Sequence, residues 1–375
     1  MQLTSFLVIN KTLKYRVISF TMNMSQSPHH MQLPREVIVG WGILDRVGNI
    51  CKQLGLSSPA LVLTGSHTYD IAGKKVISSL ENQGYKTDFL LVKESTIRQV
   101  IEAIETIKSY NPNIILGVGG GKVIDVAKFS SYKVDIPFIS VPTAASHDGI
   151  ASDSSSISDS EKPVSIRVKA PLGIIADTEI VSQSPNRLTT SGCGDIIAKY
   201  TAVRDWELAH ELKNEYYGEY ASNLALMSAK LIMKNAKIIS QNKEEGLRIV
   251  LEALLSCGVA MNIAGSSRPC SGSEHLFSHA LNIVSNKAAL HGEQCGIGTI
   301  MMAYLQKKNW RMVREKLKTI GAPVTAKELG IKPSHIIEAL TIAHTIRPER
   351  YTILGRDGLT RDAAEDLAKA VDVID

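Results

Sequence analysis

An apolar run enters three consecutive glycines at Asn113-Ile-Ile-Leu-Gly-Val-Gly-Gly-Gly121-Lys122-Val-Ile-Asp125. Such a run predicts a buried strand, and glycines that open a helix let a phosphate approach the backbone N–H groups at the positive helix end. The stretch is not a G-x-G-x-x-G fingerprint, because position 122 is Lys. It is not a Walker A loop either, because Val123 stands where Ser or Thr is required. We interpret it as a pyrophosphate cradle, and a tight turn without a ligand is the alternative.

Strand-like and helix-like patterns alternate on both sides of this stretch. Strands are predicted over 36–40, 60–65, 86–92 and 137–142, and helices over 43–54, 71–84, 96–110 and 122–131. Strands that alternate with helices of about 10–15 residues indicate βαβ units and a mostly parallel, Rossmann-like sheet. Ligands of such sheets bind beyond the carboxyl ends of the strands.

The pattern changes near Ser184-Pro-Asn-Arg-Leu188. Before it, the serine-rich segment 152–160 is predicted as a loop that leads to a small hairpin of residues 162–169 and 173–177. After it, helices are predicted over 195–211, 216–239, 244–264 and from 273 onward. A chain of 375 residues is long enough for two cores. We therefore predict an α/β domain over 31–185 and an all-helical domain over 186–375.

Bulk composition narrows the class of protein. Apolar residues make up 44% and charged residues 21% of the chain, which is typical of a soluble globular protein. Three of the five net positive charges come from Lys11, Lys14 and Arg16, so we expect no nucleic-acid partner. The five cysteines form no C-x-x-C pair, which indicates free thiols and a cytoplasmic location. We expect no membrane span, because no apolar run approaches about 18 residues.

Residues 1–30 form a basic leader without acidic residues. No small-residue cleavage site follows its apolar run, which argues against a signal peptide. A transit peptide, or an extension ahead of a later start, are the alternatives. We expect this leader to be poorly ordered and dispensable for function.

The helical half contains the residues suited to chemistry. His275 and His279 are four residues apart and share one helix face, and His291 follows 16 residues later. With Asp195 upstream, His275 and His291 form an oxygen and two-nitrogen ligand set, which suits Zn²⁺ first and Fe²⁺ second. Three protein ligands leave one position open, as in a catalytic site. His279 is then placed for an outer contact or a proton.

The sequence allows two roles for each of several neighbouring charged residues. Glu274 and Glu293 stand beside the two ligand histidines and either orient them or are solvated. Lys199, one turn after Asp195, either neutralises nearby charge or faces water. Ordinary histidines of a helical core would also produce this pattern.

A second polar loop, Thr143-Ala-Ala-Ser-His-Asp-Gly-Ile-Ala-Ser152, follows the strand over 137–142. It should lie at the same sheet edge as the glycines, where the hydroxyls of Thr143, Ser146 and Ser152 can contact a dinucleotide. Asp148 offers an acceptor for a substrate hydroxyl. A polar loop in which Asp148 only caps a helix is the alternative.

Taken together, these motifs resemble the superfamily of iron-dependent alcohol dehydrogenases, glycerol dehydrogenases and dehydroquinate synthases. Within it, the chain is similar to the archaeal-type sn-glycerol-1-phosphate dehydrogenases from about Pro34 to the C-terminus. The resemblance is carried by Gly119–Asp125, Pro142–Ser152, Gly194-Asp195, Ile263–His279, Leu290–Gln294 and Ile346–Gly355. It departs from the family in the basic leader and in Cys270, where a small residue such as Ala is expected.

The resemblance implies a dehydroquinate synthase-like fold with one Zn²⁺ per subunit, held by Asp195, His275 and His291. It implies that Asp148, Asp195 and His279 contact the substrate. NAD(H) or NADP(H) would be bound by ten residues: Gly121, Lys122, Val123, Ile124, Asp125, Thr143, Ala144, Ala145, Ser146 and Ser152.

The implied reaction reduces dihydroxyacetone phosphate to sn-glycerol 1-phosphate, the backbone of ether lipids. A glycerol or other polyol dehydrogenase is the first alternative, and a dehydroquinate synthase-like lyase the second. The substrate phosphate needs cations, for which the sequence offers Lys122, Lys199, Arg268 and Arg347 without ranking them. We expect a homo-oligomer whose subunit number the sequence does not give.

Overall fold

The central sheet of the protein is parallel throughout. The computed structural model describes residues 29, 31–159, 162–241, 243–285 and 289–375, and the predicted leader lies outside them apart from His29. The six strands follow the order β1-β8-β5-β4-β2-β3. Their bounds are β1 Glu36–Gly40, β2 Ala60–Thr64, β3 Thr87–Leu91, β4 Ile114–Gly119, β5 Phe138–Pro142 and β8 Gly173–Asp177.

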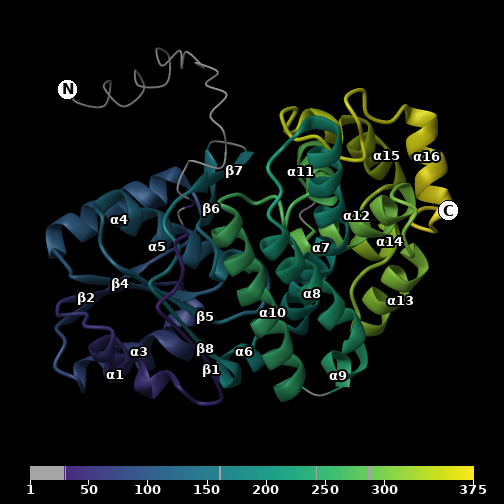
Figure 1. The fold of residues 1–375 in the computed structure, drawn as a ribbon. Helices are drawn as coiled ribbons and strands as arrows, with labels where there is room; N and C mark the ends of the chain where they lie inside the picture. The colour runs from purple at the N-terminus through teal and green to yellow at the C-terminus, as the bar shows by residue number, and fades with distance from the viewer. Residues whose placement is uncertain (1–28, 30, 160–161, 242, 286–288) are drawn as a thin grey trace, which may run out of the picture. The chain divides into compact units, whose positions relative to one another are not determined.

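Helices cover both faces of this sheet (Figure 1). On one face lie α1 (Val47–Gln53) and α3 (Lys74–Glu81), and on the other lie α4 (Ile97–Tyr110) and α5 (Gly121–Val134). Strand β2 is buried throughout because its alternate side chains serve the two cores. Ala60 and Val62 pack with α1 and α3, whereas Leu61 and Leu63 pack with α4 and α5. Three short elements complete this region: η2 (Leu44–Arg46), α2 (Ser66–Thr68) and η3 (Tyr69–Gly73).

The predicted hairpin of residues 162–169 and 173–177 is wrong. Strand β7 (Lys162–Arg167) instead pairs antiparallel with β6 (Ser154–Asp159), and residues 173–177 form β8, which lies between β1 and β5 in the main sheet. The serine-rich segment was predicted as a loop because serines weaken its hydropathy. Its burial nevertheless alternates, with Ser155 and Ile157 buried, and this is the pattern of a strand with one covered face.

The second half of the chain is helical, so the predicted fold class is confirmed. Its helices are α6 Thr178–Ser182, α7 Asn186–Lys213, α8 Glu219–Lys234, α9 Ala236–Gln241, α10 Lys243–Ala264, α11 Ser273–Val284, α12 His291–Leu305, α13 Trp310–Ile320, α14 Ala326–Leu329, α15 Pro333–Ile342 and α16 Arg361–Ala370. Short turns η4 (Asp148–Ile150) and η5 (Ala343–Thr345) accompany them. The division into domains at residue 185 stays a prediction, although α/β structure gives way to helices between α6 and α7.

Helix α10 is the one described helix that is long and apolar enough to cross a membrane. Of its most apolar window, 72% is buried inside the protein, where α10 packs against α7 and α8. These properties are those of the core helix of a folded domain. The five cysteines are free and buried, as the sequence predicts.

Candidate active site

Helices α7 and α12 touch backbone to backbone, and this contact builds the site. A Cβ atom on Gly194 of α7 would lie 2.2 Å from the carbonyl oxygen of Gly292, and one on Gly292 would lie 1.8 Å from the carbonyl oxygen of Ser191. Only glycine therefore fits at both positions. The contact places Asp195 of α7 beside His291, which opens α12. Helix α7 begins at Asn186, before the predicted start at 195, so that Gly192 and Gly194 lie inside it.

Two imidazoles meet at this crossing with their Nδ1 atoms already engaged. His275 Nδ1 donates to Glu274 Oε1 at 2.8 Å, and its Nε2 lies 3.4 Å from Asp195 Oδ1. The Ser278 hydroxyl donates to Gln294 Oε1 at 2.6 Å, so its oxygen accepts from His291 Nδ1 at 3.2 Å. The ring centroids of His275 and His291 are 5.0 Å apart. With Nδ1 engaged on each ring, Nε2 is the nitrogen that a metal ion would take.

One pair of these donors has the spacing of two zinc ligands. Oxygen and nitrogen ligands on one tetrahedral Zn²⁺ lie about 3.4 Å apart, and the Asp195–His275 pair has that separation. The buried carboxylate of Glu274 fixes His275 from behind and itself accepts from Thr201 Oγ1 at 2.8 Å. Of the two roles predicted for Glu274, orientation of its neighbouring histidine holds, because its carboxylate is buried against His275.

Glu293 is neither solvated nor bound to His291. It is buried and pairs with Arg187, whose Nε lies 2.6 Å from its Oε1. Its Oε2 also accepts from Leu290 N at 2.9 Å, at the start of α12. Glu293 therefore caps the helix that carries His291 and fixes where that helix begins.

Cys295 lies beside the two predicted ligand histidines. Donor atoms of His275, His291 and Cys295 all lie within 4.8 Å of one another. Burial raises the pKa of the Cys295 thiol, but positive charge on His275 and His291 outweighs it and lowers that pKa to about 7. The sequence held a signal, because Cys295 follows His291 by one helical turn. A search for pairs of cysteines does not reveal it, because the neighbour of Cys295 is a histidine.

Lys199 links the predicted metal ligand to the predicted substrate contact. Its fully buried ammonium lies 2.6 Å from Asp195 Oδ1 and 2.8 Å from Asp148 Oδ2, and the backbone N–H of Asp148 donates to Asp195 Oδ2 at 3.0 Å. Burial raises the pKa of Asp195, but Lys199 and the two histidines outweigh it and hold that pKa well below its usual range. Of the two readings for Lys199, charge neutralisation is the correct one.

His279 lies one turn beyond His275, with its ring centroid 6.0 Å from that of His291. Burial lowers the pKa of His279 to about 3, and the positive charges of His291, His275 and Arg347 add to the effect. A neutral imidazole at this position can accept or donate one hydrogen bond without carrying charge.

The glycine loop joins the sheet to this site. Gly120 caps α5 without a side-chain hydrogen bond, which leaves the first N–H groups of the helix available to an anion. A Cβ atom on Gly121 would lie 2.0 Å from His147 Nε2, and Thr143 N donates to Gly119 O at 3.0 Å. The loop over residues 143–152 therefore packs directly on the glycine loop, as its place after the neighbouring strand predicts.

The ten predicted cofactor residues differ in what they expose. Lys122 is exposed, and Gly121 and Ser146 are half-buried. The side chains of the other seven are buried: Val123, Ile124, Asp125, Thr143, Ala144, Ala145 and Ser152. Burial raises the pKa of Asp125, which packs toward His147 and Gly149. At these buried positions, a cofactor can contact backbone groups and the surface of the loop more than side chains.

Lys128 was not predicted and has a structural role. Its fully buried ammonium donates to Gly149 O at 2.5 Å and to Ser154 O at 2.7 Å. It thereby ties the loop that contains Asp148 to helix α5.

Among the four predicted phosphate-binding cations, Lys199 and Arg268 are already paired. Arg268 forms a bidentate pair with Glu215 and also donates to Tyr351 O at 3.0 Å. Lys122 is exposed at the start of α5. Within the described ranges Arg347 has no ion pair, it is half-buried, and it lies near enough to His279 to lower the pKa of that ring.

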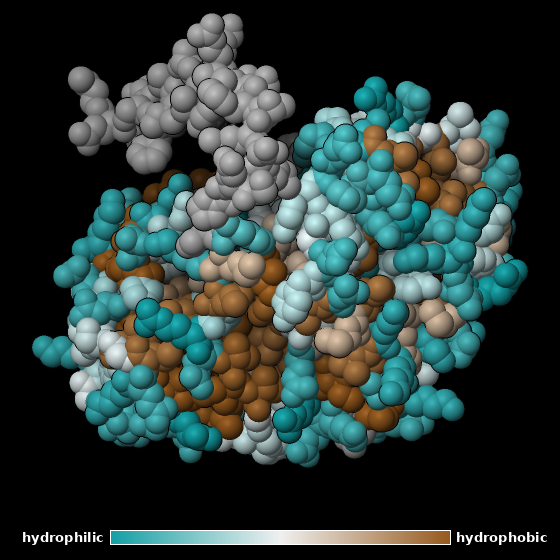
Figure 2. Space-filling view, viewed as in Figure 1, coloured by the Kyte–Doolittle hydropathy of each residue, from teal (hydrophilic) through white to brown (hydrophobic). Residues whose placement is uncertain are grey.

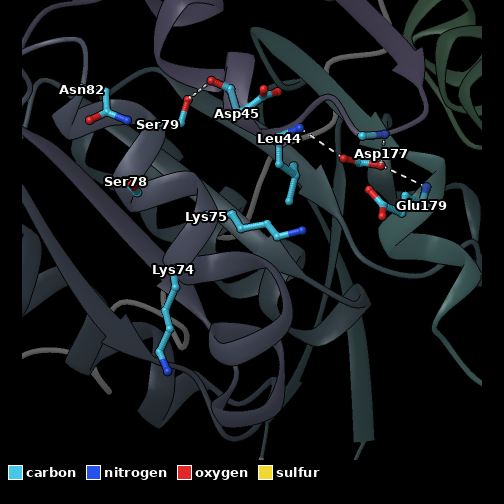
Figure 3. Close-up of a pocket in the computed structure, with 10 residues that line it drawn as sticks. Leu44, Asp45, Lys74, Lys75, Ser78, Ser79, Asn82, Asp177 and Glu179 are labelled. Carbon is cyan, nitrogen blue, oxygen red and sulfur yellow. Dashed lines mark hydrogen bonds between the residues drawn. The ribbon is translucent and has the colours of Figure 1, made fainter.

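Two surface cavities lie apart from the donor cluster. One, of about 530 Å³, lies between α3 and the residues that follow β1 and β8. Figure 3 shows Lys75 extended toward the side that carries Asp177 and Glu179, whereas Lys74 points away. The Asp177 carboxylate accepts from Gly42, Ile43, Leu44 and Glu179 backbone N–H groups, so it closes the β1 turn and caps α6. The second cavity, of about 740 Å³, is basic and includes Arg350 and Arg356.

Comparison with known proteins agrees with this architecture. Residues 38–185 match the family described as iron-containing alcohol dehydrogenase. Glycerol dehydrogenase from Schizosaccharomyces pombe has a similar fold, with a TM-score of 0.78 at 21% identity over 92% of this chain and 91% of that one. The chain thus has the fold of that glycerol dehydrogenase, and its α/β half resembles the iron-containing alcohol dehydrogenases.

Sequence relatives narrow the class. Glycerol-1-phosphate dehydrogenase [NAD(P)+] from Methanosarcina mazei is 54% identical over 95% of this chain and 100% of that protein. The enzyme of the same name from Thermococcus sibiricus is 54% identical over 92% of this chain and 99% of that protein. The chain belongs to the glycerol-1-phosphate dehydrogenase family and is an oxidoreductase, as the resemblance predicts.

Proposed function

We propose that the protein is a zinc-dependent enzyme that reduces dihydroxyacetone phosphate to sn-glycerol 1-phosphate with NADH or NADPH, for ether-lipid backbones. One observation carries the proposal beyond the relatives' names. His147 lies on Gly121 of the glycine loop, while the next residue, Asp148, donates its backbone N–H to Asp195 Oδ2. A single loop therefore couples the region suited to a dinucleotide to the cluster suited to a metal.

Asp195, His275 and His291 would hold one zinc ion per subunit. Bound there, the ion supplies a Lewis acid that polarises a ketone and stabilises the negative charge that develops on its oxygen. The nicotinamide cofactor supplies the hydride.

The chain's own residues prepare this chemistry in three ways. Glu274 and Ser278 hold the two imidazoles in the ligand tautomer. Lys199 balances the charge of Asp195 and Asp148, so that two carboxylates coexist in a buried site. Asp148 is partly exposed and offers its carboxylate to a substrate hydroxyl. His279, neutral and next to His291, is the group we propose for proton movement.

Arg347 is the cation we propose for the substrate phosphate. The reason is its lack of a described carboxylate partner together with its position near His279. Arg268 is engaged with Glu215, and Lys199 with two carboxylates. An Arg347→Ala variant should raise KM for dihydroxyacetone phosphate and leave the weak rate with unphosphorylated dihydroxyacetone unchanged.

The direct test is oxidation of NADH and of NADPH with dihydroxyacetone phosphate, followed by determination of the product's chirality. A strong preference for dihydroxyacetone phosphate over dihydroxyacetone is expected. Equal use of both ketones would instead indicate a polyol dehydrogenase. Absence of net cofactor oxidation would indicate a lyase that regenerates its cofactor.

The metal role has its own test. Asp195→Asn or His291→Ala should lower turnover by a factor on the order of a thousand or more, because a Lewis acid contributes several kcal/mol to such a reaction. Binding of NADH, followed by its fluorescence, should survive in both variants. Full activity in Asp195→Asn protein that retains no zinc would refute the role.

We also propose a homo-oligomer in the cytoplasm. Both edge strands carry exposed apolar side chains: Val37 is 44% and Phe89 40% exposed, on β1 and β3 respectively. Figure 2 shows apolar residues gathered over the part of the face where Figure 1 labels β1, β8 and α6. Exposed apolar edges invite pairing with a second chain. Light scattering on Val37→Lys and Phe89→Lys variants should show which edge is used, and a monomeric unmodified protein would contradict the proposal.

A further inference from the structure

A buried carboxylate outside the donor cluster joins three segments around the candidate active site. Asp205 lies on α7, the helix that carries Asp195, and is fully buried. Its Oδ2 accepts from the backbone N–H of Ser273 at 2.6 Å and from the Ser273 hydroxyl at 2.5 Å. Its Oδ1 accepts from the backbone N–H of Ile353 at 2.8 Å and from Gln306 Nε2, at the end of α12, at 3.1 Å.

One of these segments is the start of α11. The helix begins at Ser273, and its N-cap residue Gly272 has no side chain to accept from the first N–H groups. The Asp205 carboxylate takes that place from a neighbouring helix, at the end where negative charge is favourable. Only glycine fits beside it, since a Cβ atom on Gly272 would lie 2.6 Å from Asp205 Oδ2. Asp205 thereby fixes where the helix that carries His275 and His279 begins.

The other carboxylate oxygen holds residues 346–355, which we call the arginine segment. This segment consists of turns and bends, so contacts with other elements set its position. One contact is the bond from Ile353 N to Asp205, and another is the bond from Arg350 to Ser271 O at 2.7 Å. Both contacts tie the arginine segment to α7 and to the turn that precedes α11.

A carboxylate fits this place better than an amide. The four described hydrogen bonds of Asp205 all come from donors, and three of these donors are N–H groups that cannot accept. An amide side chain has only one oxygen, so its NH₂ group would face an N–H group on one side or the other. Burial raises the pKa of Asp205 to about 6, and negative charge on Glu274 adds to the effect. The charge itself is therefore unfavourable here, and what the carboxylate contributes is two acceptors in fixed positions.

We propose that Asp205 is a positioning residue that sets the spacing between Arg347 of the arginine segment and the histidines of α11, and so favours a phosphorylated ketone. This inference rests on the proposed function and names a further residue that determines its specificity. A ketose phosphate must place its carbonyl at the donor cluster and its phosphate on a cation at the same time. The described hydrogen bonds of Asp205 reach both ends of that arrangement and none of the predicted metal ligands.

Asp205→Asn tests the proposal through a comparison of two ketones. Dihydroxyacetone and its phosphate would react at the same donor cluster, so a disturbance of α11 lowers kcat/KM for both and cancels in their ratio. A disturbance of the arginine segment affects only the phosphorylated ketone. We expect KM for dihydroxyacetone phosphate to rise and the ratio of the two kcat/KM values to fall by about tenfold or more. An unchanged ratio would overturn the proposal and leave Asp205 with a structural role.

A double variant shows whether Asp205 acts through Arg347. Arg347→Ala should lower the ratio by itself. When both substitutions are present, the loss should be smaller than the product of the two single losses, because a displaced arginine has less binding energy to lose. Losses that multiply in full would mean that Asp205 does not act through Arg347.

Asp177→Asn is the matched control for lost stability. Asp177 is also a buried carboxylate that accepts from four backbone N–H groups, but these belong to the β1 turn and to α6. Asp177→Asn should lose stability in urea, as Asp205→Asn does, and should keep the ratio of the unmodified protein. A ratio that falls equally in both variants would show a general effect of lost stability and would contradict the proposal.

Hydrogen exchange measures the contact without relying on turnover. In the unmodified protein the amide of Ile353 should exchange slowly although it lies in a turn, and exchange in the arginine segment should become faster in Asp205→Asn. Fast exchange at Ile353 in the unmodified protein would overturn the proposal even if Asp205→Asn does not fold. Equal use of both ketones by the unmodified protein would refute the proposed function, and slow exchange at Ile353 would then show that Asp205 still holds the segment, so the two failures are told apart.

Discussion

Two fully buried lysines hold the loop over residues 147–154 from opposite sides. Lys199 on α7 meets the carboxylates of Asp148 and Asp195, whereas Lys128 on α5 donates to the carbonyl oxygens of Gly149 and Ser154. Burial lowers the pKa of both lysines, but the two carboxylates outweigh it at Lys199 and raise its pKa well above the usual value. At Lys128 burial prevails, and the pKa is lowered.

This difference separates two ways of building a site. On the helical side, the loop is held by charge, and the same ammonium sets the charge state of a proposed metal ligand. On the sheet side, the loop is held by hydrogen bonds from Lys128 to backbone oxygens, and the nearby carboxylates of Asp125 and Asp153 raise the pKa of Lys128 less than burial lowers it. The helical side should therefore respond to charge-removing substitutions in both stability and chemistry, and the sheet side mainly in stability and cofactor affinity.

The largest effect is expected for Lys199→Met. It leaves two carboxylates buried without their shared cation, and removing one partner from a buried charge pair costs about 3–5 kcal/mol. Urea unfolding should show a loss of that size, and turnover should fall with it. The double variant in which Asp148 is also replaced by Asn should recover part of the stability but not the turnover. If Lys199→Met alone is as stable as the unmodified protein, the loop is not held by charge on the helical side.

Lys128→Met should cost less. Two buried carbonyl oxygens lose their donor, which costs about 1–3 kcal/mol. Because Lys128 touches neither metal ligand nor Asp148, kcat in cofactor-saturated enzyme should change by less than about tenfold. A zinc content equal to that of the unmodified protein is expected, and zinc loss here would mean that the sheet side also sets the charge of the donor cluster.

The sequence predicted the sheet side well because its signals are local. The run into Gly119, Gly120 and Gly121 places a strand, a turn and a helix start within nine residues, and neighbouring parallel strands bring the next loop to the same edge. What it missed was tertiary. Nothing local reveals that Lys128 reaches Gly149 and Ser154, and the serine-rich strand β6 is buried by contacts that its composition does not indicate.

On the helical side the sequence supplied residue types but not their partners. Asp195, His275 and His291 were selected by chemistry and resemblance, and the structure brings them to one helix crossing. That crossing depends on Gly194 and Gly292, which are 98 positions apart in the chain. Because glycine is unfavourable inside a helix and its contact here is with a distant backbone, the local sequence does not reveal why it is needed. The role of Asp195, His275 and His291 as metal ligands stays a prediction that the zinc measurements decide.

Gly121→Ala should act on the cofactor alone. The added methyl group would lie 2.0 Å from His147 Nε2, so the imidazole must move off the glycine loop. That movement disturbs the N–H groups at the start of α5, and we expect weaker NADH binding by about tenfold, or 1.4 kcal/mol. Lys133→Ala, an exposed substitution near the other end of α5, is the control. Equal NADH affinities of the two variants, measured by fluorescence titration, would argue against a cradle at this turn.

The smallest effect is expected at a third lysine, Lys308, whose pKa is also lowered by burial. Lys308 is partly buried and donates to Tyr200 O at 2.6 Å, and burial, with Arg204 adding, lowers its pKa to about 8. Between that pH and the usual lysine value of 10.5, the folded protein binds fewer protons than the unfolded chain, so stability should rise with pH through this window. Partial exposure reduces the expected rise to about 1 kcal/mol. Urea unfolding at pH 7.5 and 9.5 should show the rise in the unmodified protein and in Lys318→Met, an exposed control on α13, but not in Lys308→Met. If all three proteins respond alike, burial does not lower the pKa of Lys308. Burial would then also fail to explain why the pKa of Lys128 is lowered while that of Lys199 is raised.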